Sequence, residues 1–179
     1  DMVLLGFIAR WDPLKDHSNL LQALSIIKKN NRKFACILVG NDMSSQNSVL
    51  MELIHKNELD DHIILPGPRS DIPAIMNALD LHVLSSFSES MPLAIIEAMA
   101  CGTPCVVTDV GDAALVVGDT GWVVPPKEPN ALAAGIETGI VALEKNDKDE
   151  LGQRCRRVIE EQYSLEVMVD SYVKLWGKT

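Results

Sequence analysis

The fold is decided by residues 81–108, which read LHVLSSFSESMPLAIIEAMACGTPCVVT. An apolar run of strand length, Leu81 to Ser85, opens this segment, and a second run, Pro104 to Thr108, closes it. Between them we predict a helix from Pro92 to Cys101, because proline favours the first helical turn and Gly102 favours a helix end. Since both strands are apolar on both faces, they are typical of a parallel sheet that helices cover on each side.

The same alternation of strand and helix extends from this segment toward both ends of the chain. Short apolar runs predict further strands at Met2 to Ala9, Phe34 to Val39, His62 to Leu65 and Trp122 to Val124. Longer patterns predict further helices at His17 to Asn30, Asn47 to Leu59, Asp71 to Leu79, Asn130 to Leu143, Asp149 to Gln162 and Leu165 to Trp176. With right-handed crossovers this order predicts a doubly wound, Rossmann-like α/β fold, with about six parallel strands, helices on both faces and a helical C-terminal tail.

The composition excludes several classes of protein. The 179 residues are enough for one compact domain, and the formal net charge of -9 repels polyanions, so we expect no nucleic acid partner. The four cysteines form no CxxC pair and have no histidine at zinc-finger spacing, which favours a reduced, cytoplasmic setting. No apolar run approaches the roughly 18 residues of a membrane span.

Ligands of open parallel sheets bind beyond the carboxyl ends of the strands, which directs attention to the helix from Pro92 to Cys101. At its start, free backbone amides at Met91 to Leu93 would bind an anion. Glu97 is the single ionisable residue between Met91 and Cys101, and a helix this apolar is expected to be buried. A lone buried carboxylate needs a partner, which two sugar hydroxyls of a nucleotide would supply, as would a structural arginine or backbone group.

Three more charged residues lie near the ends of predicted strands. Glu89 precedes the helix in a serine-rich loop, so it either lies at the mouth of a ligand pocket or is a charge favoured by the helix dipole. Arg10 and Lys15 flank the loop after the first strand and could converge on a diphosphate. The alternative is a solvated pair of cations that are bonded to Asp12 or Asp16.

Motifs for other chemistries are missing from the sequence. Neither GxGxxG nor GxxxxGK[ST] follows a strand, which disfavours dinucleotide cofactors and P-loop chemistry. The one DxD triplet, Asp147 to Asp149, lies between predicted helices, and we interpret it as a solvated helix start rather than a metal site. None of the four histidines pairs with another at metal-ligand spacing, so no metal ion is predicted.

Taken together, the motifs occur in the order found in the retaining glycosyltransferases of the GT-B fold. They are Gly6-Phe7-Ile8-Ala9-Arg10 with Lys15, Leu38-Val39-Gly40-Asn41, Leu65-Pro66-Gly67-Pro68-Arg69, the E-x7-E pair of Glu89 and Glu97, Glu97-Ala98-Met99-Ala100-Cys101-Gly102-Thr103-Pro104, and Gly121-Trp122-Val123-Val124-Pro125-Pro126. From Gly6 to about Trp176, the chain resembles the C-terminal, donor-binding domain of the group 1 (family 4 type) enzymes.

The resemblance implies a binding site for a UDP-, GDP- or ADP-sugar, with no other cofactor. Arg10 and Lys15 would stabilise the leaving diphosphate without a metal ion, and Glu97 would hold the ribose hydroxyls. Glu89 would contact the sugar near the reacting carbon, so Glu89, Arg10 and Lys15 are the catalytic candidates. The remaining contacts would come from Gly40, Asn41 and Arg69 around the base, and from Met91, Pro92 and Leu93 at phosphate or sugar oxygens.

The resemblance also implies an activity for a longer protein. Enzymes of this kind transfer a hexose with retention of its anomeric configuration, commonly in polysaccharide biosynthesis, and hold the acceptor in an N-terminal domain. Residues 1–179 are therefore expected to form a single C-terminal domain that is inactive alone, with any peripheral membrane association residing in the absent domain. Leu115 stands where the family often has glutamate. A non-catalytic nucleotide-sugar-binding module, or a GT-B relative such as an epimerase, stays open as an alternative.

Overall fold

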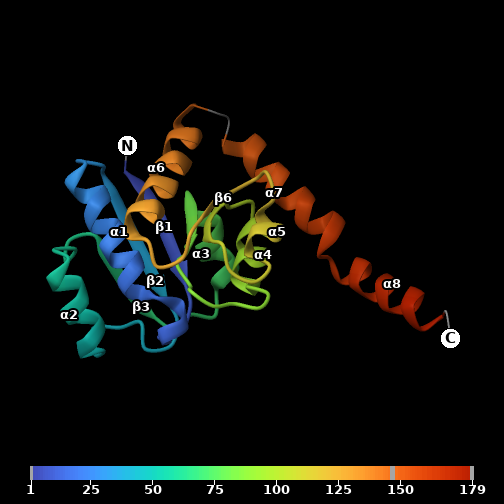
Figure 1. Cartoon of the computed structure of the whole chain (residues 1–179), viewed down its shortest axis with the longest axis horizontal. Helices are drawn as coiled ribbons and strands as arrows, with labels where there is room; N and C mark the ends of the chain where they lie inside the picture. The colour runs from blue at the N-terminus through green and yellow to red at the C-terminus, as the bar shows by residue number, and fades with distance from the viewer. Residues whose placement is uncertain (1, 146–147, 178–179) are drawn as a thin grey trace.

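The computed structural model describes residues 2–145 and 148–177, and its centre is one six-stranded parallel sheet (Figure 1). The strands are β1 (Val3–Ile8), β2 (Phe34–Val39), β3 (Ile63–Gly67), β4 (Leu81–Leu84), β5 (Cys105–Thr108) and β6 (Trp122–Val124). Their order in the sheet is β3-β2-β1-β4-β5-β6, so the winding reverses between β1 and β4. This arrangement confirms the predicted doubly wound fold and places the expected ligand edge at the carboxyl ends of β1 and β4.

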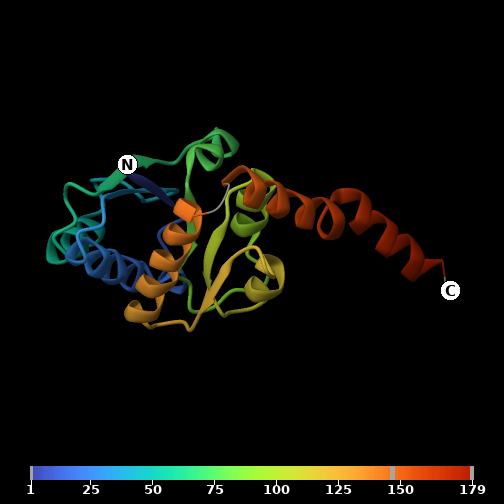
Figure 2. The same ribbon diagram turned by 90° about the horizontal axis from the view of Figure 1, so that it is seen from above.

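Helices cover both faces of the sheet, as the view from above shows (Figure 2). They are α1 (His17–Lys29), α2 (Ser48–Lys56), α3 (Ile72–Ala78), α4 (Leu93–Ala100), α5 (Ala113–Val117), α6 (Pro129–Lys145), α7 (Lys148–Gln162) and α8 (Leu165–Trp176), with a 3-10 turn η1 (Pro13–Lys15). Side chains of α1, α2 and α6 share one core cluster, and those of α3, α4, α5 and α7 share the other. The sequence predicts neither η1 nor α5, because three and five residues carry too little helical periodicity.

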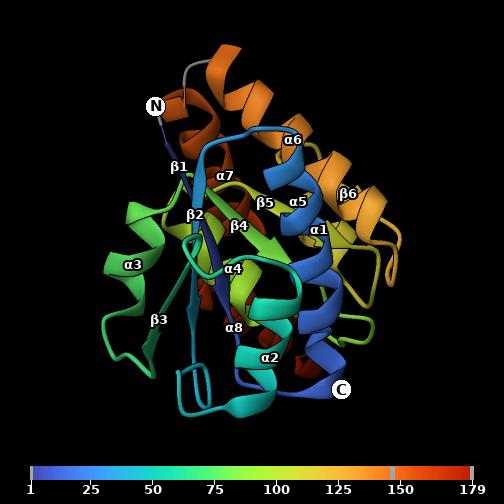
Figure 3. The same ribbon diagram turned by 90° about the vertical axis from the view of Figure 1, so that its left-hand side faces the viewer.

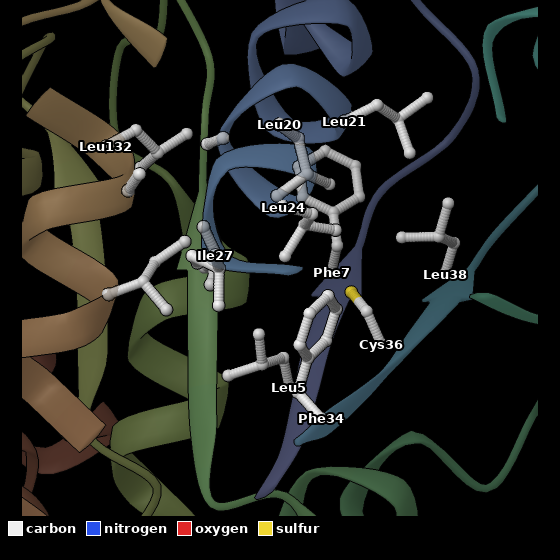
Figure 4. Close-up of a cluster of buried hydrophobic side chains, with 14 of the residues drawn as sticks. Leu5, Phe7, Leu20, Leu21, Leu24, Ile27, Phe34, Cys36, Leu38 and Leu132 are labelled. Carbon is white, nitrogen blue, oxygen red and sulfur yellow. The ribbon is translucent and has the colours of Figure 1, made fainter. Parts of the chain in front are cut away.

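The larger core cluster shows why these residues form these elements (Figure 4). Leu20, Leu24 and Ile27 lie on one stripe of α1 and are fully buried. They meet Leu5 and Phe7, which alternate along β1 and so point to the same face of the sheet. Each such side chain contributes on the order of 2 kcal/mol by leaving water, so this packing fixes α1 over the sheet.

Helix α8 projects from this compact body (Figures 1 and 2), and in the view of Figure 3 it lies behind the body. It begins at a side-chain cap, in which Ser164 Oγ accepts a hydrogen bond from the amide of Val167 at 3.3 Å. None of its residues is buried, and the ring of Tyr172 lies against that of Trp176 in a tilted arrangement, at a centroid distance of 5.3 Å. Within the described ranges, every helix is too short or too polar to cross a membrane.

Two histidines are buried in the body of the protein. His82 of β4 is 1% exposed, and neither of its ring nitrogens has a hydrogen-bond partner among the described residues. Burial lowers the pKa of His82 to about 4. Burial also lowers the pKa of His17 to about 4, and the Trp11 ring lies 4.4 Å from its ring. Both rings are therefore neutral in the folded protein at pH values where an unfolded chain binds protons.

We predict that replacing His82 with leucine reduces the acid sensitivity of folding. The unfolded histidine titrates near pH 6.5 and the folded one near 4, so its contribution to stability is complete above pH 6.5 and is lost as the pH falls to 4. Urea unfolding from pH 7 to pH 4 should show that His82→Leu loses roughly 3 kcal/mol less than the wild type. The control Gln22→Leu, at an exposed position without a titratable group, should follow the wild-type curve. Equal slopes for His82→Leu and the wild type would contradict this interpretation.

Candidate functional site

The loops that follow β1 and β4 are tied together at the carboxyl edge of the sheet. The buried hydroxyl of Ser85 donates to the carbonyl oxygens of Lys15 at 2.8 Å and Asp16 at 3.1 Å. The amide of Phe87 donates to the carbonyl of Leu14 at 3.0 Å. These bonds join residues that are about seventy positions apart in the sequence, at the point where the winding of the sheet reverses.

The centre of this junction is an ion pair between Lys15 and Glu89. Lys15 Nζ lies 2.5 Å from Glu89 Oε1, and Ser86 Oγ donates to the same oxygen at 2.7 Å. The two charged side chains are only 23% and 12% exposed. Lys15 reaches this position from the last residue of η1, whose first turn is capped by Asp12 through the amide of Leu14. The structure thus brings together two of the three predicted catalytic residues.

Arg10, the third of them, forms a separate ion pair. Its Nε and Nη2 atoms donate to Asp12 Oδ2 at 3.0 and 2.8 Å, and its side chain is 67% exposed. These hydrogen bonds lower the pKa of Asp12, and the amide of Leu14 adds to the effect. Arg10 follows the predicted alternative of a solvated cation bonded to Asp12, whereas Lys15 pairs with Glu89.

A hollow of about 240 Å³ opens beside Arg10, at the carboxyl ends of β1 and β2. Its walls include Gly40, Asn41 and Arg69, so the residues predicted to surround a base do gather in one place. Gly40 has a φ of +150°, and a Cβ at this position would lie 2.1 Å from the carbonyl oxygen of Ala9. Only glycine therefore allows β1 and β2 to end this close together.

Two further arginines, Arg69 and Arg32, form ion pairs with nearby acidic side chains. Arg69 donates two hydrogen bonds to Asp71, at 2.8 and 2.6 Å, which raise the pKa of Arg69. At the opposite edge of the sheet, a wider hollow of about 550 Å³ contains Arg32 bonded to Glu137 and Glu144. This second hollow has internally paired charges and lies away from the strand ends that carry the candidate site.

The prediction of a buried Glu97 is wrong. Helix α4 buries Ile95, Ala98 and Met99 on one side, whereas Glu97 is exposed and Leu93 is 63% exposed. The apolar sequence of α4 does not distinguish a helix that is covered all round from one with an uncovered apolar face, and α4 is of the second kind. A ribose contact at Glu97 consequently rests on the family resemblance and not on the need to pair a buried charge.

The start of α4 also differs in detail from the prediction. Pro92 is the N-cap residue and is buried, while Leu93 is the first helical residue. Proline has no N–H, so Pro92 cannot donate to a ligand oxygen, and an anion at this end would have to be bound by neighbouring amides. The exposed side chains of Met91 and Leu93 flank this helix start, with exposures of 44% and 63%.

The turn between β5 and α5 supports the loop that carries Glu89. The buried hydroxyl of Thr108 donates to the carbonyl of Ser86 at 2.5 Å, and the amide of Asp112 donates to the carbonyl of Ser90 at 2.9 Å. Gly111 has a φ of +52°, and a Cβ there would lie 2.2 Å from the oxygen of Ser90. This close approach holds the Glu89 loop against the following strand.

Sequence reasoning missed these supporting groups. Ser85, Ser86 and Thr108 stand at strand ends, where hydroxyl side chains beside a candidate loop could have indicated a hydrogen-bonding role. Asp12 was considered only as a competitor for the cations, although it also caps η1.

Among the described residues, no three histidine, cysteine, aspartate or glutamate side chains lie close enough together to hold a metal ion. Lys148 of the DxD triplet begins α7 and binds Asp80 at 2.5 Å, whereas Asp147 lies outside the described residues.

Several known proteins are similar to this chain over nearly its whole length. The chain is 26% identical to an N-acetyl-alpha-D-glucosaminyl L-malate synthase of Bacillus anthracis over 178 residues, which are 97% of this chain and 45% of that protein. A glycosyltransferase from Rickettsia africae superposes with a TM-score of 0.89 at 24% identity, over 99% of this chain and 48% of the other. HepE from Anabaena, solved with UDP and glucose, superposes with a TM-score of 0.84 at 25% identity, over 98% and 48%.

The chain therefore spans less than half the length of each of these three proteins. The family model described as "Glycosyl transferases group 1" matches residues 3–142, which include β1 to β6 and all of the candidate site. With this match over most of its length, and with the doubly wound sheet described above, the chain belongs to the group 1 glycosyl transferases.

Proposed function

We propose that this chain is the donor-binding domain of a glycosyltransferase that transfers a hexose from a nucleotide-diphospho-sugar to an acceptor, with retention of configuration. The observation that carries the proposal is the Lys15–Glu89 pair at the switch point of the sheet. A cation and a carboxylate in contact, both mostly buried, are suited to a ligand that has an anionic diphosphate next to a hydroxyl-rich sugar.

The two catalytic cations would act on the leaving diphosphate. Lys15 would exchange Glu89 for a phosphate oxygen, and Arg10 would leave Asp12 to bind the same group. The Arg10 side chain is 67% exposed, so solvent screens its pairing with Asp12 and the exchange for a phosphate costs little. Charge that develops on the diphosphate as the sugar leaves is then stabilised by side chains, and we propose that the reaction needs no metal ion and no further cofactor.

The nucleotide would extend from this diphosphate into the hollow beside Arg10. Gly40, Asn41 and Arg69 would line the base there, and Glu97 on the open face of α4 would accept from the ribose hydroxyls. Among UDP, GDP and ADP we favour UDP, because HepE, at 25% identity, was solved with UDP and glucose. Glu89 would contact the sugar near the carbon that reacts.

The acceptor is assigned to a second, N-terminal domain. Because the chain spans less than half the length of the relatives described above, we propose that a complete enzyme holds its acceptor in a further, N-terminal domain. A cytoplasmic location, a role in polysaccharide biosynthesis and any membrane association of the longer protein stay predictions.

A second candidate function is a nucleotide-sugar-binding module without catalysis. Leu115, which stands where the family often has glutamate, is 71% exposed on α5 next to the Glu89 loop, and this departure favours the alternative. The two functions differ in the longer protein: Glu89→Gln abolishes sugar transfer by an enzyme, whereas a binding module has no transfer to lose.

We predict that UDP and UDP-glucose raise the melting temperature of this chain without magnesium. A ligand that binds only the folded state at tenfold its Kd stabilises it by about 1.4 kcal/mol, or roughly 3–6 °C for a domain of this size. Thermal unfolding with UDP, GDP and ADP and their glucose conjugates, each with and without magnesium, identifies the base. A shift that requires magnesium would refute metal independence, and no shift from any nucleotide would remove the support for donor binding by this chain.

We also predict opposite effects from the two partners of the central ion pair. Lys15→Met removes the cation and should weaken UDP binding about tenfold or more, whereas Glu89→Gln removes the competitor for Lys15 and should leave UDP affinity equal or higher. Titration calorimetry measures both changes, with Lys29→Met, an exposed site on α1, as the control. Parallel losses in Lys15→Met and Glu89→Gln would show that the pair supports the fold and does not compete with the diphosphate.

A further inference from the structure

Glu89 has a second partner that is fixed more firmly than Lys15. Its Oε1 atom accepts from Lys15 Nζ at 2.5 Å and from Ser86 Oγ at 2.7 Å. Ser86 is fully buried, and its carbonyl accepts the hydroxyl of Thr108 at 2.5 Å, so the residue is held from β5 as well as by its own loop. Lys15, in contrast, ends in a long flexible side chain that is 23% exposed.

The two partners differ in what happens to them when a diphosphate arrives. Under the proposed function, Lys15 turns to the phosphate and Glu89 loses the cation. A carboxylate that is only 12% exposed is costly to leave without a donor. Ser86 lies three residues before Glu89 and is already bonded to it, so it can retain the carboxylate with no rearrangement of the loop.

We propose that Ser86 is the positioning residue for Glu89, holding Oε1 so that Oε2 is presented to the donor sugar after Lys15 has moved to the diphosphate. This inference rests on the proposed function of the site. According to this proposal, the neighbouring residues Ser85 and Ser86 have different roles. Ser85 bonds to the main chain at Lys15 and Asp16 and so joins the loops, whereas Ser86 acts on a side chain that meets the ligand.

The decisive experiment is a double-mutant cycle on the affinity for UDP-glucose, measured by titration calorimetry on this chain. Ser86→Ala should weaken binding about tenfold in the wild type, the effect expected of one hydrogen bond to a charged group. In a Glu89→Ala background the same change should have no effect, because no carboxylate remains to be positioned. Ser86→Thr, which keeps the hydroxyl, should restore the affinity. Ser88→Ala, at an exposed position of the same loop, is the control and should bind as the wild type does.

If Ser86→Ala lowers the affinity for UDP-glucose equally in the wild type and in the Glu89→Ala background, Ser86 supports only the fold and the proposal is overturned. Unchanged affinity in Ser86→Ala would also overturn it. A second cycle without nucleotide separates this failure from that of donor binding. Urea unfolding gives the unfolding equilibrium constants of Ser86→Ala, Glu89→Ala and the double variant. The change in the double variant should differ from the product of the two single changes by at least about threefold. If this coupling is present but the wild-type chain binds no UDP-glucose, the donor proposal fails first and the positioning role falls with it. If the wild type binds but the coupling is absent, only the role of Ser86 is overturned.

Discussion

The structure depends on one constraint, which is that both faces of a parallel sheet must be covered. The strands present apolar side chains on each face, and α1, α2 and α6 cover one face while α3, α4, α5 and α7 cover the other. Helices fill the faces, so polar groups that must reach a ligand are left to the ends of the strands. Where the strand order reverses, the chain leaves β1 toward α1 on one face and β4 toward α4 on the other, and the two loops meet at the candidate site.

At that edge, buried hydroxyl groups hold the loops that carry the charged side chains of the candidate site. Ser85 joins the Lys15 loop to β4, and Thr108 fixes the carbonyl of Ser86 from β5. Ser85 and Thr108 are buried, so the main chain around the ion pair is held from two strands. Under the proposed function, Lys15 and Glu89 would change partners within this frame when a diphosphate binds.

Much of the site could be predicted from the sequence, since strand ends and helix starts are local features. Arg10, Gly40, Asn41 and Arg69 do line one hollow. Burial was predicted less well. The apolar run of α4 suggested a helix covered all round, yet Glu97 is exposed, because burial depends on which neighbouring elements reach each face and not on the composition of the helix.

The sequence by itself determined the alternation of strands and helices and the doubly wound class of the fold, because hydrophobic periodicity is a property of short segments. It also set the order of the motifs that mark the family. Only the tertiary structure decided that Arg10 pairs with Asp12, that Lys15 pairs with Glu89, and that Ser86 shares the Glu89 oxygen. These hydrogen-bond partners are fixed by distances of a few ångströms between loops that are distant in the chain. They therefore follow from packing and hydrogen-bond geometry, which no local pattern of residues encodes.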